Sequence, residues 1–220
     1  MQQQRHQSKR VRGMDRLCDL IALWIAVMIL GCNDPDPPPE GAPTRFAAVK
    51  KEVARDAASK FCEAHYESGE RKWTPPPERV LPRAAEGAPN PEGQVWTWVN
   101  LWASWCGPCL EEMPLLERWK ISLQKEGLPI RIELWSVDVE PEAMMKALSD
   151  RTYPGEVRWL RGEEDLPGLL AGLGLPRDTA IPVHGLVDPH GDLRCVRVGK
   201  VGEANYASVK TIVGSVAGVP

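Results

Sequence analysis

The stretch "VNLWASWCGPCLEEMP", residues 99–114, decides how the rest of this 220-residue chain is interpreted. It contains two cysteines, Cys106 and Cys109, which are separated only by Gly107 and Pro108. Cysteines at this spacing can supply half of a zinc site, form a structural disulfide, or act as a redox pair that opens and closes. The rest of the chain has to distinguish these three possibilities.

The segments that flank the cysteines predict a buried strand followed by a helix. Residues 94–104 are apolar and rich in β-branched and aromatic side chains, which is typical of a buried strand. Residues 109–126 carry leucine and methionine at helical spacing, and Gly127 is suited to end a helix. Pro114 lies inside this helix and is expected to kink it. The two cysteines therefore fall at a strand-to-helix junction.

This position favours a redox pair. A helix N-terminus carries a partial positive charge and free N–H groups, which stabilise a thiolate at Cys106. Pro108 stiffens the turn, and Cys109 lies one helical turn further on, where it can attack a mixed disulfide on Cys106. A zinc site needs four ligands, and neither the other cysteines nor the four histidines show ligand spacing. A structural disulfide is the weaker alternative, because so short a loop removes little entropy from the unfolded chain.

The composition limits the class of protein. The apolar fraction is 43% and the charged fraction 26%, which is typical of a soluble globular protein. The length fits one domain with an additional arm. The net charge of −3 argues against nucleic acid as a partner, because phosphate binding requires clustered lysine and arginine.

The N-terminus predicts export. Residues 5–16 are basic, and residues 20–30 form an apolar run that is marginal for spanning a ~30 Å hydrocarbon core, so the pattern indicates a secretory signal. The stretch "ILGC" (29–32) resembles a bacterial lipoprotein processing site, which implies cleavage before Cys32 and a lipid on its thiol. An uncleaved signal anchor is the alternative, and Met14 is an alternative start. A cleaved lipoprotein signal and an uncleaved signal anchor both place the rest of the chain outside the cytoplasm and at a membrane.

The remaining segments predict an α/β protein with a mixed sheet. A Pro-rich tether is followed by a helix that Thr44 can cap and by a long irregular connection. After the helix that follows the cysteines, strands and helices alternate, and the chain ends with a hairpin and a closing helix. The expected elements are a helix at 44–67, an irregular segment at 73–93, strands at 130–140 and 157–160, helices at 141–151 and 163–174, a hairpin at 181–198 and a helix at 203–216.

Two stretches carry a resemblance to a known family. "VNLWASWCGPCLEEMP" resembles the active-site segment of the thioredoxin superfamily, and "AIPVHGLVDPHGDL" (180–193) resembles its cis-proline strand and the following hairpin. The nearest likeness is to the membrane-tethered TlpA/ResA-like branch, which includes the cytochrome c maturation thioredoxins. The resemblance covers about residues 94–216. It implies a thioredoxin-like fold, a mixed central sheet flanked by helices, here with an extra N-terminal helix.

The chain is expected to divide into four parts, and the resemblance assigns the site in the last of them. The parts are a lipoprotein signal peptide at 1–31, a Pro-rich tether at 32–43, an N-terminal helix and irregular arm at 44–93, and a thioredoxin-like domain at 94–220. Catalytic roles are implied for four residues: Cys106 attacks, Cys109 resolves the mixed disulfide, Glu112 helps to move protons, and Pro182, in a cis peptide with Ile181, shapes the docking groove.

Acidic residues near the cysteines need separate interpretations. Cytosolic thioredoxins have a buried aspartate on the strand six residues before the first cysteine, and here that place is Asn100, which cannot shuttle a proton. This difference shifts the proton-transfer role to Glu112. The alternative is that Glu112 is a solvated acid in the first helical turn, favoured by the helix dipole. For Glu111 the solvated interpretation is preferred.

Flanking residues are expected to form the surface around the disulfide. Trp105 is expected to cover the disulfide and to contribute to docking, with Gly107, Pro108 and Ile181 beside it. Trp102 is expected in the core. His184, two residues after the proline, is expected only to pack or to be solvated next to the hairpin.

The other cysteines remain partly open. Cys18 lies in the signal segment. Cys62 in the N-terminal helix and Cys195 in the last strand either form a disulfide that ties the arm to the domain or stay as two separate thiols. An oxidising compartment is compatible with both arrangements.

We therefore expect an extracytoplasmic thiol–disulfide oxidoreductase, lipid-anchored on the periplasmic or cell-surface side of a bacterial membrane. The "CGPC" motif (106–109) and Ile181 before the cis proline match reducing members of the superfamily, so a reductase of protein disulfides is favoured, with cytochrome c maturation as one process it would serve. The alternatives are a disulfide-forming oxidant and a non-catalytic copper-binding module. We expect no cofactor and no metal, protein thiols as substrates, a membrane electron donor, and a monomer.

Overall fold

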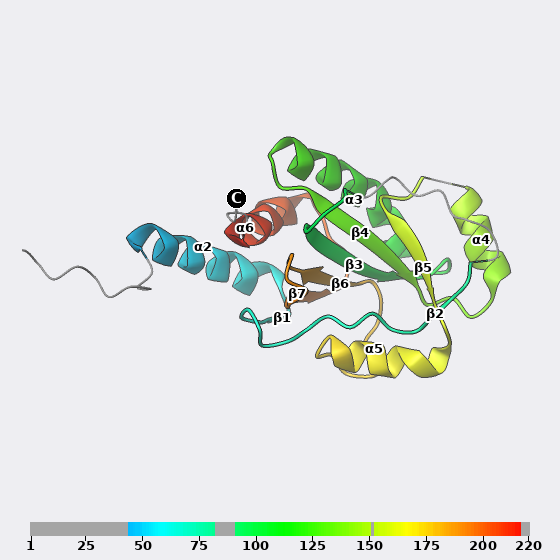
Figure 1. The fold of residues 1–220 in the computed structure, drawn as a ribbon. Helices are drawn as coiled ribbons and strands as arrows, with labels where there is room; N and C mark the ends of the chain where they lie inside the picture. Colours follow the sequence, from blue (N-terminus) through cyan, green and yellow to red (C-terminus); the bar gives the residue numbers. More distant parts are fainter. Residues whose placement is uncertain (1–43, 82–90, 151, 217–220) are drawn as a thin grey trace, which may run out of the picture. The chain divides into compact units, whose positions relative to one another are not determined.

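The computed structural model describes residues 44–81, 91–150 and 152–216 (Figure 1). The predicted signal segment, Cys32 and the tether lie outside the described residues. Within the described residues, no helix is both long enough and apolar enough to cross a membrane.

The described strands form one sheet. Its centre is β3 (Trp96–Trp102), which runs parallel to β4 (Ile130–Ser136) on one side and antiparallel to β6 (Val183–Val187) on the other. The remaining strands extend the sheet in the order β1-β7-β6-β3-β4-β5-β2, where β1 is Ala64–His65, β7 is Leu193–Val198, β5 is Glu156–Leu160 and β2 is Glu78–Arg79. The sheet is thus parallel on the side of β4 and β5 and antiparallel on the side of the hairpin.

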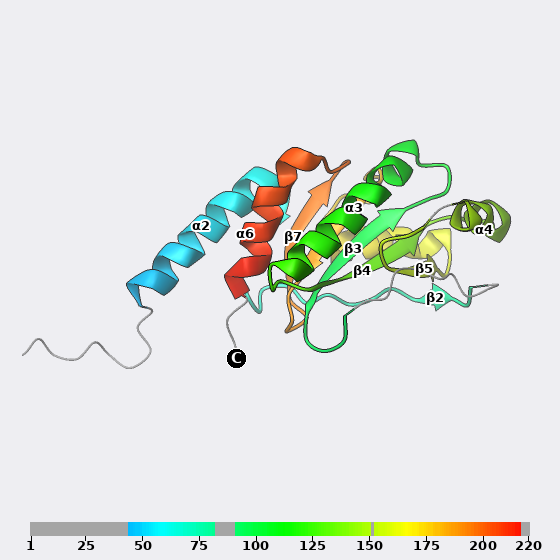
Figure 2. The ribbon, with the colours of Figure 1, turned by 90° about the horizontal axis from the view of Figure 1, so that it is seen from above.

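The central strand is buried on both faces, which explains its apolar sequence. Side chains alternate across a strand, so Trp98 and Trp102 join one hydrophobic core and Val99 and Leu101 join the other. The first core also takes residues from α2 (Arg45–Phe61), α3 (Gly107–Lys125), α4 (Pro141–Ser149) and α6 (Tyr206–Val216), and the second from α5 (Leu166–Gly172). Figure 2 shows α2, α6 and α3 lying across one side of the sheet.

Helix α3 carries the cysteines and ends as its sequence predicts. Gly127 adopts φ 75°, which a residue with a side chain rarely adopts. The N–H of Leu128 donates to the carbonyl of Leu123 over 2.9 Å, and the N–H of Gly127 donates to that of Gln124 over 3.1 Å. These are the paired bonds of a Schellman motif, so the helix that positions the cysteines has a well-defined C-terminal end.

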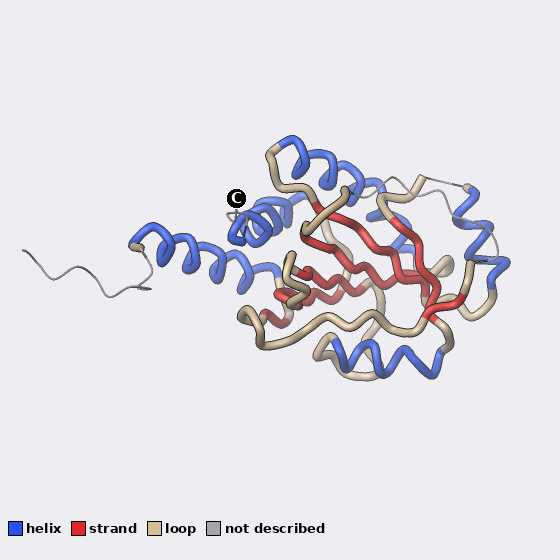
Figure 3. The backbone as a smooth tube through the Cα atoms, in the orientation of Figure 1, coloured by secondary structure: helices blue, strands red, loops and turns tan. Residues whose placement is uncertain are grey.

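The N-terminal arm differs from the prediction. Helix α2 ends at Phe61, not at 67, because the chain turns extended at Cys62 and then adds β1 to the sheet. The segment expected to be irregular contributes β2, which pairs with β5 at the opposite edge. Between these two strands the arm runs as a long loop (Figure 3). Strands of two residues have no sequence period of their own and form only because an existing sheet edge offers hydrogen bonds.

The arm is also attached covalently. Cys62 and Cys195 form a disulfide with Cα atoms 5.5 Å apart, which decides between the two arrangements that the sequence left open. Backbone bonds from Glu63 to Val196 (2.7 Å) and from Tyr66 to Arg194 (3.0 Å) continue along the same edge. The arm is therefore part of the sheet.

The chain has the expected thioredoxin-like fold. A central strand leads into the helix that carries the cysteine pair, a parallel strand follows, and a cis proline introduces an antiparallel hairpin and a closing helix. The arm completes both edges of this sheet.

Candidate active site

The first feature of the site is the disulfide between Cys106 and Cys109 at the start of α3. Their Cα atoms are 5.3 Å apart, and Cys106 is the N-cap residue of the helix. The backbone N–H of Cys109 points at the Sγ of Cys106 over 3.3 Å. Cys106 is 5% exposed, whereas Cys109 is 0% exposed. Cys109 is thus fully enclosed, whereas Cys106 borders the exposed residues beside it.

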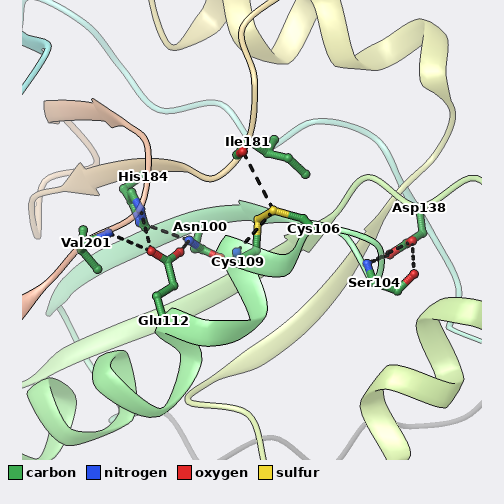
Figure 4. The surroundings of a disulfide bond; sticks show 9 residues. All are labelled: Asn100, Ser104, Cys106, Cys109, Glu112, Asp138, Ile181, His184 and Val201. Atoms are coloured by element: carbon green, nitrogen blue, oxygen red, sulfur yellow. Dashed lines mark hydrogen bonds and ion pairs between the residues drawn. A yellow bond between two sulfur atoms is a disulfide. The ribbon is translucent and has the colours of Figure 1, made fainter.

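A carbonyl group from another part of the chain faces this sulfur. The peptide bond between Ile181 and Pro182 is cis, as the resemblance implied. The carbonyl oxygen of Ile181 lies 3.9 Å from the Sγ of Cys106 (Figure 4). The segment just before β6 thus lies against the disulfide, although about 75 residues separate the two in sequence.

The surface around Cys106 is apolar and open. Trp105 is 70% exposed, Gly107 and Pro108 are exposed, and Ile181 is half-buried. Trp102, by contrast, is fully buried in the core. The indole of Trp105 is thus an exposed apolar surface next to the nearly buried Cys106.

A buried aspartate that the sequence analysis did not identify holds the loop before the cysteines. Asp138, at the carboxyl end of β4, accepts hydrogen bonds from the backbone N–H of Ser104 (2.9 Å) and from the hydroxyls of Ser104 (2.6 Å) and Ser136 (2.7 Å). Figure 4 shows this anchor beside the disulfide. The carboxyl ends of parallel neighbours meet at one edge of a sheet, so a polar residue just after the second strand was the signal that could have indicated it.

Glu112 is fully buried, so its interpretation as a solvated first-turn acid is wrong. Its Oε1 accepts a hydrogen bond from the amide of Asn100 over 3.0 Å, and its Oε2 accepts one from the backbone N–H of Val201 over 2.9 Å. Glu111, in contrast, is exposed and pairs with Lys200 over 2.6 Å. The hydrogen bond from Lys200 lowers the pKa of Glu111 below its ordinary value.

His184 is 1% exposed and lies in the same polar cluster. The indole N–H of Trp98 donates to its Nδ1 over 3.1 Å, and its Nε2 is 3.5 Å from Oε2 of Glu112. The packed position was expected, but these polar contacts were not. They arise because β3 and β6 place Asn100 directly opposite His184.

The described residues contain no group of three or more histidine, cysteine or acidic side chains arranged to hold a metal ion. What the site does contain is one sulfur next to exposed residues, one enclosed sulfur, and a buried carboxylate one helical turn beyond the second. Two sulfurs in this arrangement can exchange a disulfide with another molecule.

Among known proteins, no protein-family model and no curated protein matches the chain. Among solved structures, it is similar to the thioredoxin domain of a thiol-disulfide oxidoreductase from Bacteroides vulgatus, with 22% identity, 55% of this chain and 80% of that one covered, and a TM-score of 0.46. A thiol:disulfide interchange protein from Bacteroides sp. matches with 20% identity, 56% and 76% coverage, and a TM-score of 0.43.

StoA from Bacillus subtilis matches with 14% identity, 55% and 83% coverage, and a TM-score of 0.41. The sheet order, the cysteine-bearing helix and the cis proline define the fold of this chain.

Proposed function

We propose that this protein is an extracytoplasmic thiol–disulfide oxidoreductase that reduces disulfides in other proteins. One observation carries the proposal: the Cys106–Cys109 disulfide lies at the start of α3 against the carbonyl of Ile181, with exposed residues around Cys106 and with Cys109 fully buried. A resolving cysteine is expected to be enclosed in this way, because it must attack the mixed disulfide without reacting with solvent thiols.

The reaction runs through two exchanges. In the reduced protein, the thiolate of Cys106 attacks one sulfur of a substrate disulfide, and the other substrate sulfur leaves as a thiol after taking up a proton. Cys109 then loses its proton and attacks the Sγ of Cys106, which forms the disulfide seen in the structure and releases the second substrate thiol. Two electrons pass to the substrate, and a dithiol donor must return them.

Glu112 is the acceptor we assign to the proton of Cys109. The two residues are one helical turn apart on α3 and are both fully buried. Solvent therefore has no direct access to the thiol at the moment it must ionise. Asn100 orients the carboxylate through its hydrogen bond and cannot take the proton itself.

The segment at Pro182 is the docking element in this proposal. The carbonyl of Ile181 faces Cys106, and Trp105, Gly107 and Pro108 are exposed around it. An extended substrate segment would lie along this apolar surface with its cysteine at Cys106. The recognition is therefore expected to depend on backbone and apolar contacts.

The direction follows from the motif. "CGPC" and Ile181 before the cis proline match reducing members of the superfamily. Potentials in this superfamily run from about −270 mV for thioredoxin to about −120 mV for DsbA. A titration of the full chain against dithiothreitol or glutathione buffers, followed by the fluorescence of Trp105 and its neighbours, measures the potential. A value near −270 mV supports a reductase, and a value near −120 mV makes the protein an oxidant.

The location is proposed from the N-terminal segment and the second disulfide. A stable disulfide between Cys62 and Cys195 is typical of an oxidising compartment. Lipidation at Cys32 would hold the protein at the membrane, where a membrane electron donor could reach it. Mass analysis of the membrane-bound protein should find its new N-terminus at Cys32 with the lipid mass attached.

The activity itself is tested with Cys106→Ala. We expect the full chain to accelerate insulin reduction by dithiothreitol and the variant to lose at least about 100-fold of that acceleration, because no mixed disulfide can form. The control is the double variant Cys62→Ala/Cys195→Ala, which removes the other disulfide and should keep the acceleration. If Cys106→Ala reduces insulin at the wild-type rate, the proposed function is wrong.

A further inference from the structure

A buried polar cluster lies between the sheet and α3, next to the disulfide. Its members are Trp98 and Asn100 on β3, His184 on β6 and Glu112 on α3, each at most 1% exposed. Figure 4 shows the side chains of Asn100 and His184 converging on the carboxylate of Glu112. Polar groups buried this deeply destabilise a fold unless they satisfy one another, so the arrangement of their protons can be worked out.

The hydrogen bonds determine which nitrogen of His184 carries the proton. An indole N–H can only donate, so Trp98 must donate to Nδ1 of His184 over 3.1 Å. The amide nitrogen of Asn100 lies 3.1 Å from the same Nδ1 and 3.0 Å from Oε1 of Glu112, which are both acceptors. Nδ1 therefore holds a lone pair, and the ring proton is on Nε2.

The proton on Nε2 faces the carboxylate of Glu112. Nε2 of His184 lies 3.5 Å from Oε2 of Glu112, within ion-pair distance, and forms no hydrogen bond within the described residues. The same Oε2 also accepts from the backbone of Val201. Three N–H groups from three different segments thus face one carboxylate, and only the one from His184 belongs to a side chain that could change its own protonation.

The charged groups around this pair are few within the described residues. On β7, Arg197 is the register partner of His184, so it stands on the same face of the sheet, where its Nη1 donates to the carbonyl of Phe61 over 2.9 Å. On α3 the neighbouring ionisable groups are the two cysteines. Lys200 lies beside Val201 but is paired with exposed Glu111.

We propose that His184 is a positioning residue for Glu112, and that the buried Glu112–His184 pair sets the pH range in which Cys109 can give up its proton. The inference rests on the proposed function, in which Glu112 accepts that proton. The proton moves from the sulfur of Cys109 to the carboxylate, and His184 keeps its own proton throughout. Its N–H faces the charged carboxylate at 3.5 Å and stabilises it electrostatically.

The sign of the effect follows directly. If the N–H of His184 is removed, the ionised carboxylate is faced by two N–H groups instead of three, so its charged form is less stabilised. The step that needs the ionised carboxylate then fails at a higher pH. His184→Leu should therefore move the acidic limb of the rate profile upward by about half to one pH unit, less than a full hydrogen bond to a charged group would give, because the two atoms are 3.5 Å apart.

The experiment measures resolution of the mixed disulfide. The reduced full chain is mixed with a peptide disulfide, and the single-turnover formation of the Cys106–Cys109 disulfide is followed between pH 5 and 9. His184→Leu should shift the profile, and His184→Gln should restore most of it, because an amide can accept from Trp98 and donate to Glu112. In a Glu112→Gln background, His184→Leu should cause no further shift.

A matched control separates this effect from a loss of packing. Val187→Ala shortens a buried side chain on the same strand whose neighbours belong to the other core. It should lower the melting temperature and leave the profile unchanged. If His184→Leu is folded and has the wild-type profile, the inference is overturned and His184 is only a packed residue.

The position of the ring proton on His184 provides a second test. If His184→Leu does not fold, nitrogen NMR of His184 in the wild-type protein decides: the proton must be found on Nε2, and a proton on Nδ1 overturns the inference. Failure of the proposed function is recognised separately. It would appear as wild-type insulin reduction by Cys106→Ala, whereas failure of this inference leaves Cys106→Ala inactive and the pH profile of His184→Leu unshifted.

Discussion

The two disulfides of this protein differ in the length of chain that they close. Cys106 and Cys109 are 3 residues apart, whereas Cys62 and Cys195 are 133 residues apart. In the chain-entropy description, cross-links of these lengths destabilise the unfolded state by about 2 and about 5 kcal/mol. The short disulfide can therefore open at little cost to the fold, while the long one contributes a large part of its stability.

The surroundings of the two disulfides repeat the contrast. Beside Cys106 lies exposed Trp105, and the carbonyl of Ile181 faces its sulfur. Cys195 is 1% exposed and Cys62 is half-buried, and strand β1, which follows Cys62, pairs with β7, which contains Cys195. The comparison teaches that the same bond serves exchange where the loop is short and lies at a helix start, and attachment where the loop is long and joins two segments of the sheet.

The largest effect is expected from removing the long disulfide. Cys62→Ala/Cys195→Ala should lower the free energy of unfolding by about 5 kcal/mol at most, since the unfolded chain regains the entropy of a 133-residue loop. Urea unfolding followed by circular dichroism measures it. Insulin reduction by the folded fraction should be unchanged. A loss below about 1 kcal/mol would show that the arm is held by its strands alone.

The next effect concerns the order of reduction. The difference of about 3 kcal/mol between the two loops corresponds to about 60 mV, so Cys106–Cys109 should open at a potential at least that much higher than Cys62–Cys195. The full chain is equilibrated with graded dithiothreitol, alkylated and mapped by mass. If Cys62–Cys195 opens first or both open together, the division between exchange and attachment fails.

A smaller effect is expected at the aspartates that accompany the two disulfides. Asp138 anchors the loop before Cys106, and Asp192 accepts bonds from Ser68 and Gly69 of the arm, both over 2.9 Å. Asp138→Ala should cost about 1–3 kcal/mol, because it leaves buried donors unsatisfied. It should also slow insulin reduction about tenfold, since the loop that positions Cys106 loosens.

Asp192→Ala is the matched control for that prediction. It removes an equally buried carboxylate, which is bonded to the arm and not to the loop before the cysteines. Stability should fall and the rate of insulin reduction by the folded protein should stay the same. Equal losses of rate in the two variants would mean that Asp138 acts on stability only.

Much of the half of the molecule that contains the short disulfide was predictable from sequence. The strand, the helix start at the cysteines and the stop at Gly127 are each determined by residues within a few positions. The cis bond before Pro182 was implied by resemblance rather than by any local rule. Local signals and the family pattern agreed here, so the fold could be predicted.

The rest could not be predicted, because it depends on neighbours that are distant in sequence. The pairing of Cys62 with Cys195 and the strands β1 and β2 exist only once a sheet edge is present. The contact between His184 and Glu112 likewise requires β6 to lie beside β3 and α3 to cover them. No periodicity within either segment carries that information.

The smallest predicted effect is a pH dependence confined to the arm. Lys72 bonds to Asp192 over 2.6 Å and, with Ser68 and Gly69, lowers the pKa of Asp192 from 3.8 to about 2. Because the folded pKa lies below the unfolded value of about 3.9, this contribution to stability is complete above about pH 4. It is lost as the pH falls from about 4 to about 2, when the folded carboxyl takes up its proton.

Amide hydrogen exchange in residues 63–73 between pH 2 and pH 5, corrected for the intrinsic exchange rates, isolates that effect. The wild-type arm should lose protection as the pH falls, while Asp192→Asn should show weaker but pH-independent protection. Glu111→Gln serves as the comparison, since the pKa of Glu111 is also lowered but its pair with Lys200 is exposed and should contribute little. If the arm keeps its full protection at pH 2, ionised Asp192 does not stabilise the arm, and the disulfide and the strands are what attach it.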